Sequence, residues 1–203
     1  MPNQPDGQPV RSWGTLIAGS DGTLGQIIKT DSDGNLQVDV LTTGLVTAST
    51  SNGYGAATTV TRPANTTAYI ANDVVGGAID LGVMGPSGGD VLITSASLEI
   101  DVTAVPAGMT TFRLALYNVT PPSALADNAP FDIPAGDRAS FLGFIDIGTP
   151  VDEVSTLFVQ ANNINKHVTL AGTNLFAYLV TAGVYTPAAV SEAYKPTVKS
   201  VAV

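Results

Sequence analysis

The sequence predicts an all-β protein: an antiparallel β-sandwich, jelly-roll-like, preceded by an extended N-terminal arm with a β-hairpin. Three observations predict this fold class. Short segments such as residues 91–102 alternate apolar and polar side chains, clusters of Gly and Pro separate these segments, and helical spacing is convincing nowhere. Many short strands divided by Gly/Pro turns are typical of sandwiches and jelly rolls.

Residues 1–45 form the first predicted unit, an arm followed by a hairpin. Prolines and glycines are scattered through residues 1–14, which favours an extended chain. Residues 24–30 and 36–41 both alternate apolar and polar side chains, and the run Asp31-Ser32-Asp33-Gly34-Asn35 between them has the composition of a tight turn. Residues 46–57 are small and polar and are predicted to be a linker.

The sandwich is predicted over residues 58–203. Its candidate strands are 58–62, 67–75, 78–83, 90–102, 111–119, 140–147, 154–160, 166–170, 174–181 and 196–203. One of them is ambiguous, because Val154, Leu157, Phe158 and Ala161 also have the spacing of a short helix. The same stretch alternates and is rich in β-branched residues, so a strand is favoured over a helix.

Charge and composition exclude several function classes. The net charge is −9, and only 12% of residues are charged, so we expect no nucleic-acid binding and no attraction to anionic membranes. Cysteine is absent, which excludes disulfides, thiolate metal sites and cysteine nucleophiles. The first residues lack the pattern of a signal peptide, and no apolar run is long enough for a transmembrane helix.

Candidate catalytic and metal-binding residues are few, and each has a simpler interpretation. His167 is the single histidine, in a predicted strand, and no G-x-S-x-G motif accompanies it. The carboxylate pairs Glu99/Asp101, Asp127/Asp132 and Asp152/Glu153 could in principle support glycoside hydrolysis, but 6% aromatic content is low for a sugar-cleaving site. The run from Asp31 weakly resembles a calcium loop but lacks its closing carboxylate. We therefore expect no enzyme activity, no cofactor and no metal.

Several segments resemble structural proteins of tailed-bacteriophage virions. They are residues 111–122, 129–138 and 175–180, the stretch 61–69 that opens similar phage domains, and the hairpin with Asp31, Gly34, Leu36, Val38 and Val40. Proteins of this group include capsid decoration (cement) proteins, head fibres and tail-fibre modules. The resemblance implies a virion component, commonly a homotrimer, made in the cytoplasm of a bacterial host.

The order of arm, linker and sandwich favours a capsid decoration protein on the outer capsid surface. A flexible arm can order on the shell, and an oligomer adds avidity because each further arm binds intramolecularly. The expected partners are the major capsid protein and further copies of the chain. The expected partner-binding residues are an aromatic anchor in the arm and the apolar side chains of the hairpin: Trp13, Leu24, Ile27, Leu36, Val38 and Val40.

Two alternatives stay open at this point. The chain could belong to the phage tail as a tail-fibre, baseplate or receptor-binding component whose sandwich binds a host glycan or protein. It could also be a carbohydrate-binding module that acts alone, although few aromatic residues are available for stacking.

Overall fold

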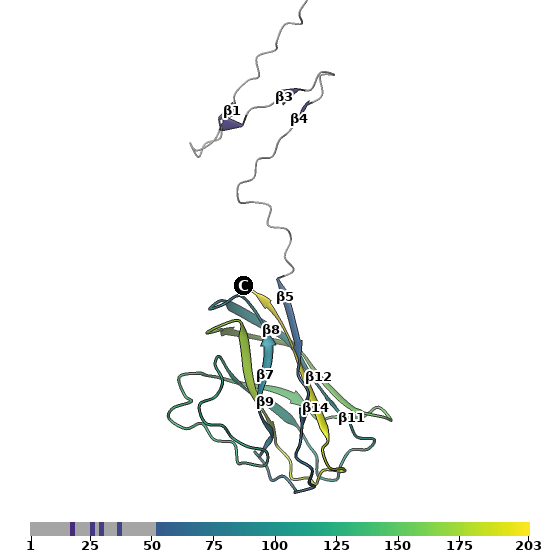
Figure 1. Ribbon diagram of the computed structural model, residues 1–203. Coiled ribbons are helices and arrows are strands. Elements are labelled where there is room, and N and C mark those ends of the chain that lie inside the picture. The colour runs from purple at the N-terminus through teal and green to yellow at the C-terminus, as the bar shows by residue number, and fades with distance from the viewer. Residues whose placement is uncertain (1–16, 19–24, 27–28, 31–35, 38–51) are drawn as a thin grey trace, which may run out of the picture. The chain divides into compact units, whose positions relative to one another are not determined.

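The computed structural model describes residues 52–203 and, before them, four two-residue strands at 17–18, 25–26, 29–30 and 36–37 (Figure 1). The chain divides into two compact units, Met1–Ala48 and Ser49–Val203. Each unit has its own internal contacts, so they are described separately.

The first unit contains two antiparallel strand pairs. β1 (Ile17–Ala18) pairs with β2 (Gly25–Gln26), and β3 (Lys29–Thr30) pairs with β4 (Leu36–Gln37). The register of β3 and β4 joins Thr30 to Leu36 across residues 31–35. An antiparallel pair therefore lies where the sequence predicts the hairpin.

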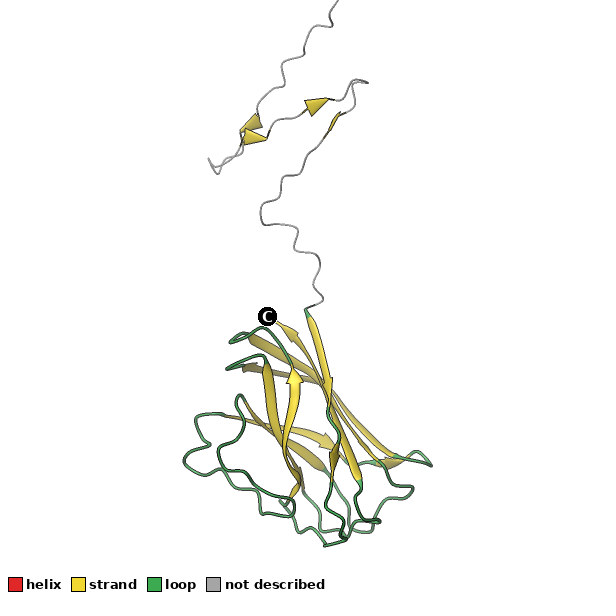
Figure 2. Cartoon of the chain, in the orientation of Figure 1, coloured by secondary structure: helices red, strands yellow, loops and turns green. Residues whose placement is uncertain are grey.

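The second unit is a β-sandwich, and its described elements are all strands (Figure 2). They are β5 (Gly53–Ala57), β6 (Val60–Thr61), β7 (Val74–Val83), β8 (Asp90–Ile100), β9 (Phe112–Tyr117), β10 (Phe141–Gly148), β11 (Val151–Asp152), β12 (Leu157–Thr169), β13 (Asn174–Thr181) and β14 (Ala193–Ala202).

The order of the strands identifies the sandwich as a jelly roll. One sheet has the order β10-β9-β13-β7, and the other has the order β11-β12-β8-β14-β5, with β6 also pairing with β14. When the short strands β6 and β11 are set aside and the other eight strands are counted from β5, the sheets read 5-4-7-2 and 6-3-8-1. All of the strand pairings are antiparallel. This is the double Greek-key arrangement of a jelly roll, and it confirms the predicted fold class.

The main core lies between the two sheets. Two alternating sets of β8 residues, separated by a register shift between Ile93 and Ser95, point into it and are at most 2% exposed: Val91 and Ile93, then Ala96, Leu98 and Ile100. Leu114 and Leu116 of β9 meet them from the opposite sheet. The alternation seen in the sequence thus marks the inner faces of both sheets, as face-to-face packing requires.

A second apolar cluster covers the outer face of the four-stranded sheet. Tyr117 and Tyr178 point outward from β9 and β13, and Leu125 and Phe131 from the segment 118–140 pack over them. This sheet is therefore buried on both faces. Burial on both sides explains why residues 175–180 of β13 are apolar without interruption.

Asp137 holds the covering segment in place. Its carboxylate is 1% exposed and accepts hydrogen bonds from both the backbone N–H (3.0 Å) and the hydroxyl of Ser123. Tyr178 completes the attachment: its hydroxyl donates to the Ser123 carbonyl and accepts from the Leu125 N–H at 3.1 Å. Hydrogen bonds to a carboxylate and a phenol thus attach a segment that forms no strand of its own to this face of the sheet.

The structure corrects three details of the strand prediction. Residues 53–57, inside the predicted linker 46–57, form β5 and pair with β14, because a Gly/Ala-rich strand carries no alternation to reveal it. The predicted strands 67–75 and 78–83 are one strand, β7, which begins only at Val74. The predicted strands 154–160 and 166–170 are joined in one strand, β12, which begins only at Leu157 and ends at Thr169, and the helical alternative from Val154 is wrong.

Candidate functional site

Most of the predicted partner-binding residues lie outside the described residues. This applies to Trp13, Leu24, Ile27, Val38 and Val40. Leu36 lies in β4, where only its backbone pairing with Thr30 is described. The capsid contact of these six residues stays a prediction. The weak calcium-loop resemblance, over residues 31–35, also lies outside the described residues.

The candidate catalytic residues do not assemble into one site. His167 is exposed on the outer face of the six-stranded sheet, opposite Leu92 of β8. Glu99 forms an ion pair with Lys195 at 2.9 Å on the same face, and both side chains are more than 40% exposed. His167 is therefore a polar strand residue, and Glu99 belongs to a cross-strand ion pair.

Of the other predicted carboxylates, three accept hydrogen bonds within the fold, and the remaining two, Asp101 and Glu153, are exposed. Asp132 accepts a hydrogen bond from the N–H of Ile133, and Asp152 accepts one from the N–H of Val154, both at 2.7 Å. Asp127 belongs to a buried network at one end of the sandwich. Within the described part of the chain, no three His, Asp or Glu side chains are grouped so that they could hold a metal ion. A search of the same residues finds no helix capable of crossing a membrane.

Arg62 is the centre of the buried network. Its side chain is fully buried and lies 3.7 Å from the Asp127 carboxylate, while its Nε donates to the Tyr69 hydroxyl. Asp127 in turn accepts from Tyr69 Oη at 2.6 Å and from the Gly76 N–H at 2.8 Å. Burial lowers the pKa of Arg62, but the Tyr69 hydrogen bond and the Asp127 charge outweigh it and raise that pKa. The network therefore holds a charged arginine inside the fold.

A chain of hydroxyl groups lies close to this network. Tyr194 Oη donates to the Glu192 carboxylate at 2.8 Å and lies 3.0 Å from Tyr185 Oη. Burial, followed by the effect of Tyr185, raises the pKa of Tyr194 above its ordinary value. Glu192 also accepts from the Ala189 N–H at 2.8 Å, which fixes the loop before β14. These polar groups are used to join loops and strands at one end of the sandwich.

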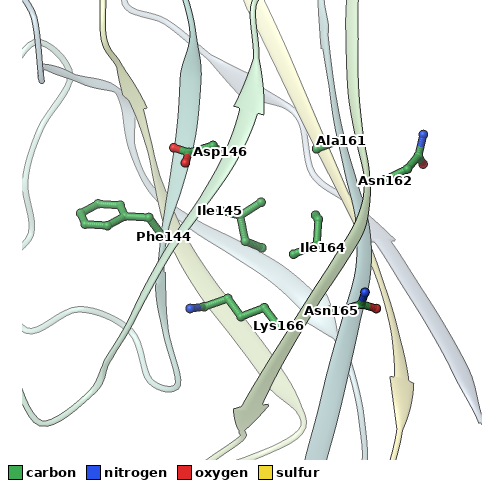
Figure 3. Close-up of a pocket in the computed structure, with 8 residues that line it drawn as sticks. All are labelled: Phe144, Ile145, Asp146, Ala161, Asn162, Ile164, Asn165 and Lys166. Carbon is green, nitrogen blue, oxygen red and sulfur yellow. The ribbon is translucent and has the colours of Figure 1, made fainter.

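An open groove lies along the side of the sandwich where β10 and β12 are the edge strands. It has a volume of about 500 Å³ and is lined by Phe144, Ile145, Asp146, Ala161, Asn162, Ile164, Asn165 and Lys166. Figure 3 shows Ile145 and Ile164 pointing toward one another between the two strands, with Lys166 extending toward β10. An apolar base with polar groups around it is the usual composition of a small-ligand site.

Both strands are bulged where they border the groove. The pairing of β10 with β9 shifts between Phe141 and Gly143, and Gly143 has a φ of 92°. The pairing of β12 with β8 shifts between Asn162 and Lys166, where Asn163 and Asn165 have φ values of 57° and 51°. A Cβ placed on Gly143 would lie 3.0 Å from Lys166 Nζ. Glycine thus leaves the space that the lysine side chain occupies.

Sequence reasoning did not identify this groove. The signal available was the run Asn162-Asn163-Ile164-Asn165-Lys166 inside an alternating segment. Asn tolerates positive φ better than other side chains, so several Asn residues within a strand pattern indicate a bulge. That the bulge of β12 faces the bulge of β10 follows only from the tertiary structure.

A second depression, of about 540 Å³, lies at the end of the sandwich between the segments 118–120 and 171–174. It is formed by loop backbone and short polar side chains together with Phe176. It contains no charged side chain and therefore has less capacity to select a ligand.

Comparison with known proteins gives structural neighbours only. No family model matches the chain, and no curated protein matches it. Among solved structures, a particle of Israeli acute paralysis virus is similar with a TM-score of 0.33, at 11% identity over 99% of this chain and 97% of the other. The Kashmir bee virus virion gives 0.34, also at 11% identity, over 99% and 96% of the two chains.

A third similar structure is that of Desmodium yellow mottle tymovirus, with a TM-score of 0.25 at 14% identity over 74% of this chain and 86% of the other. Scores and identities this low carry no argument about function. The assignment of the jelly roll therefore rests on the strand order of this chain.

Proposed function

We propose that this chain is a non-enzymatic structural protein of a virus particle, specifically a bacteriophage capsid decoration protein. In this proposal the N-terminal unit binds the major capsid protein on the outer surface of the shell, and the sandwich projects from it. The observation that carries the proposal is the division into two units at Ala48 and Ser49. The assignment to a bacteriophage, rather than to another kind of virus, is supported by the sequence resemblance to tailed-phage virion proteins.

Among the residues that the structure describes, the sandwich has a core of its own. Its main core runs from Ala56 and Val60 to Val198 and takes side chains from both sheets. The chain enters the sandwich at β5, which begins at the same end as the C-terminus (Figure 1). In this proposal the leading unit binds the shell, because a segment that orders on a shell can bury a large area.

We further propose that the protein assembles as a homotrimer in the virion, after synthesis in the bacterial cytoplasm. Three linked N-terminal units would bind one shell with avidity, because the second and third binding events are intramolecular. The low fraction of charged residues, 12%, supports a surface that is partly covered in an assembly.

The test compares the full chain with a variant that begins at Ser49. Both are mixed with empty mature capsid shells of the phage that encodes the protein, and bound protein is measured by cosedimentation. The proposal expects the shortened variant to lose binding while its thermal unfolding stays cooperative, since β5 and the whole core are retained. Trp13→Ala in the full chain should weaken binding without changing the unfolding of the sandwich. Equal affinity of the full and shortened chains would reject capsid binding by the N-terminal unit.

A tail component is the second candidate, and the loops at one end of the sandwich favour it. Ile70, Val105, Val184 and Val190 are all exposed there, between 39% and 59%, which suits contact with another protein. Copy number separates the two candidates. Hundreds of copies per virion support a capsid protein, whereas a dozen or fewer support a tail component.

A further inference from the structure

We propose that three loops at one end of the sandwich form the surface through which copies of this chain associate. The loops are residues 63–72, 102–111 and 182–191, which follow β6, β8 and β13, and together they are called the loop face. They lie at the end of the sandwich away from the C-terminus (Figure 1). This inference rests on the proposed homotrimer and identifies the surface by which its copies touch.

The loop face carries no charged side chain. None of its three loops contains Asp, Glu, Lys, Arg or His, although 12% of the chain is charged. Of the charged residues that border the loops, Arg62, Asp73 and Glu192 are at most 3% exposed, and only Asp101 is exposed. Charged residues are depleted at the centre of protein interfaces, because a charge buried there without a partner loses its hydration.

Aliphatic side chains are exposed on all three loops. Tyr69 and Tyr185 form an antiparallel bridge, and both are buried. Their neighbours Ile70 and Val184 therefore lie opposite each other on the outer side of the two loops, where they are 58% and 59% exposed. Val105 on the third loop is also exposed. Neighbouring exposed aliphatic side chains in an uncharged surrounding are typical of a protein interaction surface.

Contacts within and between the loops fix the loop face before any partner binds. The N–H of Ala182 donates to the Thr111 carbonyl at 2.9 Å, and a Cβ on Gly183 would lie 2.5 Å from the carbonyl oxygen of Gly108. The buried guanidinium of Arg62 holds the first loop by donating to the Asn65 carbonyl at 3.3 Å. Little conformational entropy is lost when a surface held in this way associates, so its apolar contacts contribute to affinity.

The occupant that fits the loop face is the loop face of another copy. The chain has a net charge of −9, so copies repel each other over most of their surface. At the loop face they can approach without bringing like charges together and without burying an unpaired charge. A partner for this surface must itself be uncharged and apolar, and the loop face has both properties.

The experiment measures self-association of the full chain by sedimentation equilibrium, at concentrations up to about 100 μM. We expect a trimer in reversible equilibrium with the monomer. Val184→Asp and Val184→Lys should each raise the concentration of half-dissociation about tenfold or more, because a charge of either sign would be buried without a partner. Ile70→Asp on the neighbouring loop should have the same effect. Both side chains are more than half exposed, so thermal unfolding should show that the variants are folded.

The matched controls are Val83→Asp and Val83→Lys. Val83 is 53% exposed and ends β7, at the opposite end of the sandwich from the loop face. Both variants should associate as the unaltered chain does. Raising the NaCl concentration from about 50 to 500 mM should strengthen association of the unaltered chain, because salt screens the repulsion between acidic copies and the loop face has no ion pair to lose.

Association that the loop-face variants leave unchanged overturns this inference and leaves the homotrimer in place. Association that Val184→Asp weakens but Val184→Lys strengthens shows a charged partner surface and also overturns it, as does association that salt weakens. A chain that is monomeric throughout overturns both this inference and the homotrimer, and a different protein then covers the loop face. Capsid binding by the N-terminal unit is measured separately by cosedimentation, so its failure is distinguishable from these outcomes.

Discussion

Replacing Asp127 by Ala should strongly destabilise the sandwich. In the folded protein Asp127 is the acceptor for Tyr69 Oη and for the Gly76 N–H, and it is the counter-ion of Arg62. The side chain of Arg62 is fully buried, and that of Asp127 is 9% exposed. The substitution therefore leaves a buried positive charge without its counter-ion, and it removes the acceptor of two partly buried donors.

The expected loss is about 3–5 kcal/mol in the free energy of unfolding, the usual effect of removing one partner from a buried ion pair. Domains of this kind are stable by about 5–15 kcal/mol, so the loss is a large fraction of the total. For a domain of this size it corresponds to a Tm lower by roughly 6–20 °C. The loss in the free energy of unfolding is measured by urea denaturation monitored by far-UV circular dichroism. Tryptophan fluorescence is not used, because the single Trp lies at position 13, outside the sandwich.

Glu99→Ala is the matched control. It removes the carboxylate of the exposed Lys195 pair, which is screened by water, and should cost no more than about 1 kcal/mol. The double variant Arg62→Met with Asp127→Ala should recover part of the loss, because no buried charge remains. If Asp127→Ala costs no more than Glu99→Ala, the buried network does not stabilise the fold in the way argued.

Three further predictions concern single side chains. Tyr117 has a buried hydroxyl with no partner among the described residues, and burial raises its pKa to about 12. Tyr117→Phe should therefore lower the free energy of unfolding by less than about 0.5 kcal/mol, and it should flatten the loss of stability between about pH 10 and 12, where only the unfolded tyrosine ionises. Tyr178→Phe loses two hydrogen bonds and should cost about 1–3 kcal/mol. Urea denaturation at several pH values measures both costs, and equal costs would refute the comparison. Gly88→Ala should cost about 1–2 kcal/mol for left-handed backbone alone, and Gly108→Ala clearly more, because its Cβ would lie 2.1 Å from a carbonyl oxygen; equal Tm values would contradict the geometry. Val154 is 85% exposed with a φ of 76°, so Val154→Asn should raise the unfolding free energy by about 1 kcal/mol, and a loss would show that the valine is needed where it stands.

The candidate groove could be predicted from the sequence only in part. Asn162-Asn163-Ile164-Asn165 indicates a bulge, but the other half of the groove comes from β10, some twenty residues earlier. Lys166 has the sequence position of an ordinary strand lysine. Only the register of β12, which places it opposite the inward-facing Ile93 and next to Gly143, makes it a groove residue. Local alternation indicates which residues of a strand share a face, but the residues that pair with them lie far away in the chain.

The amino-acid sequence by itself determined the fold class, because period-two alternation and Gly/Pro turns depend on near neighbours. It placed β8, β9, β10 and β13 to within a few residues. It did not reveal β5, whose Gly-Tyr-Gly-Ala-Ala sequence becomes a strand only because β14 offers a partner edge. Nor did it pair Arg62 with Asp127. Contacts between residues far apart in the chain decide these features, since the free energy of pairing and burial outweighs weak local propensity once the sheets come together.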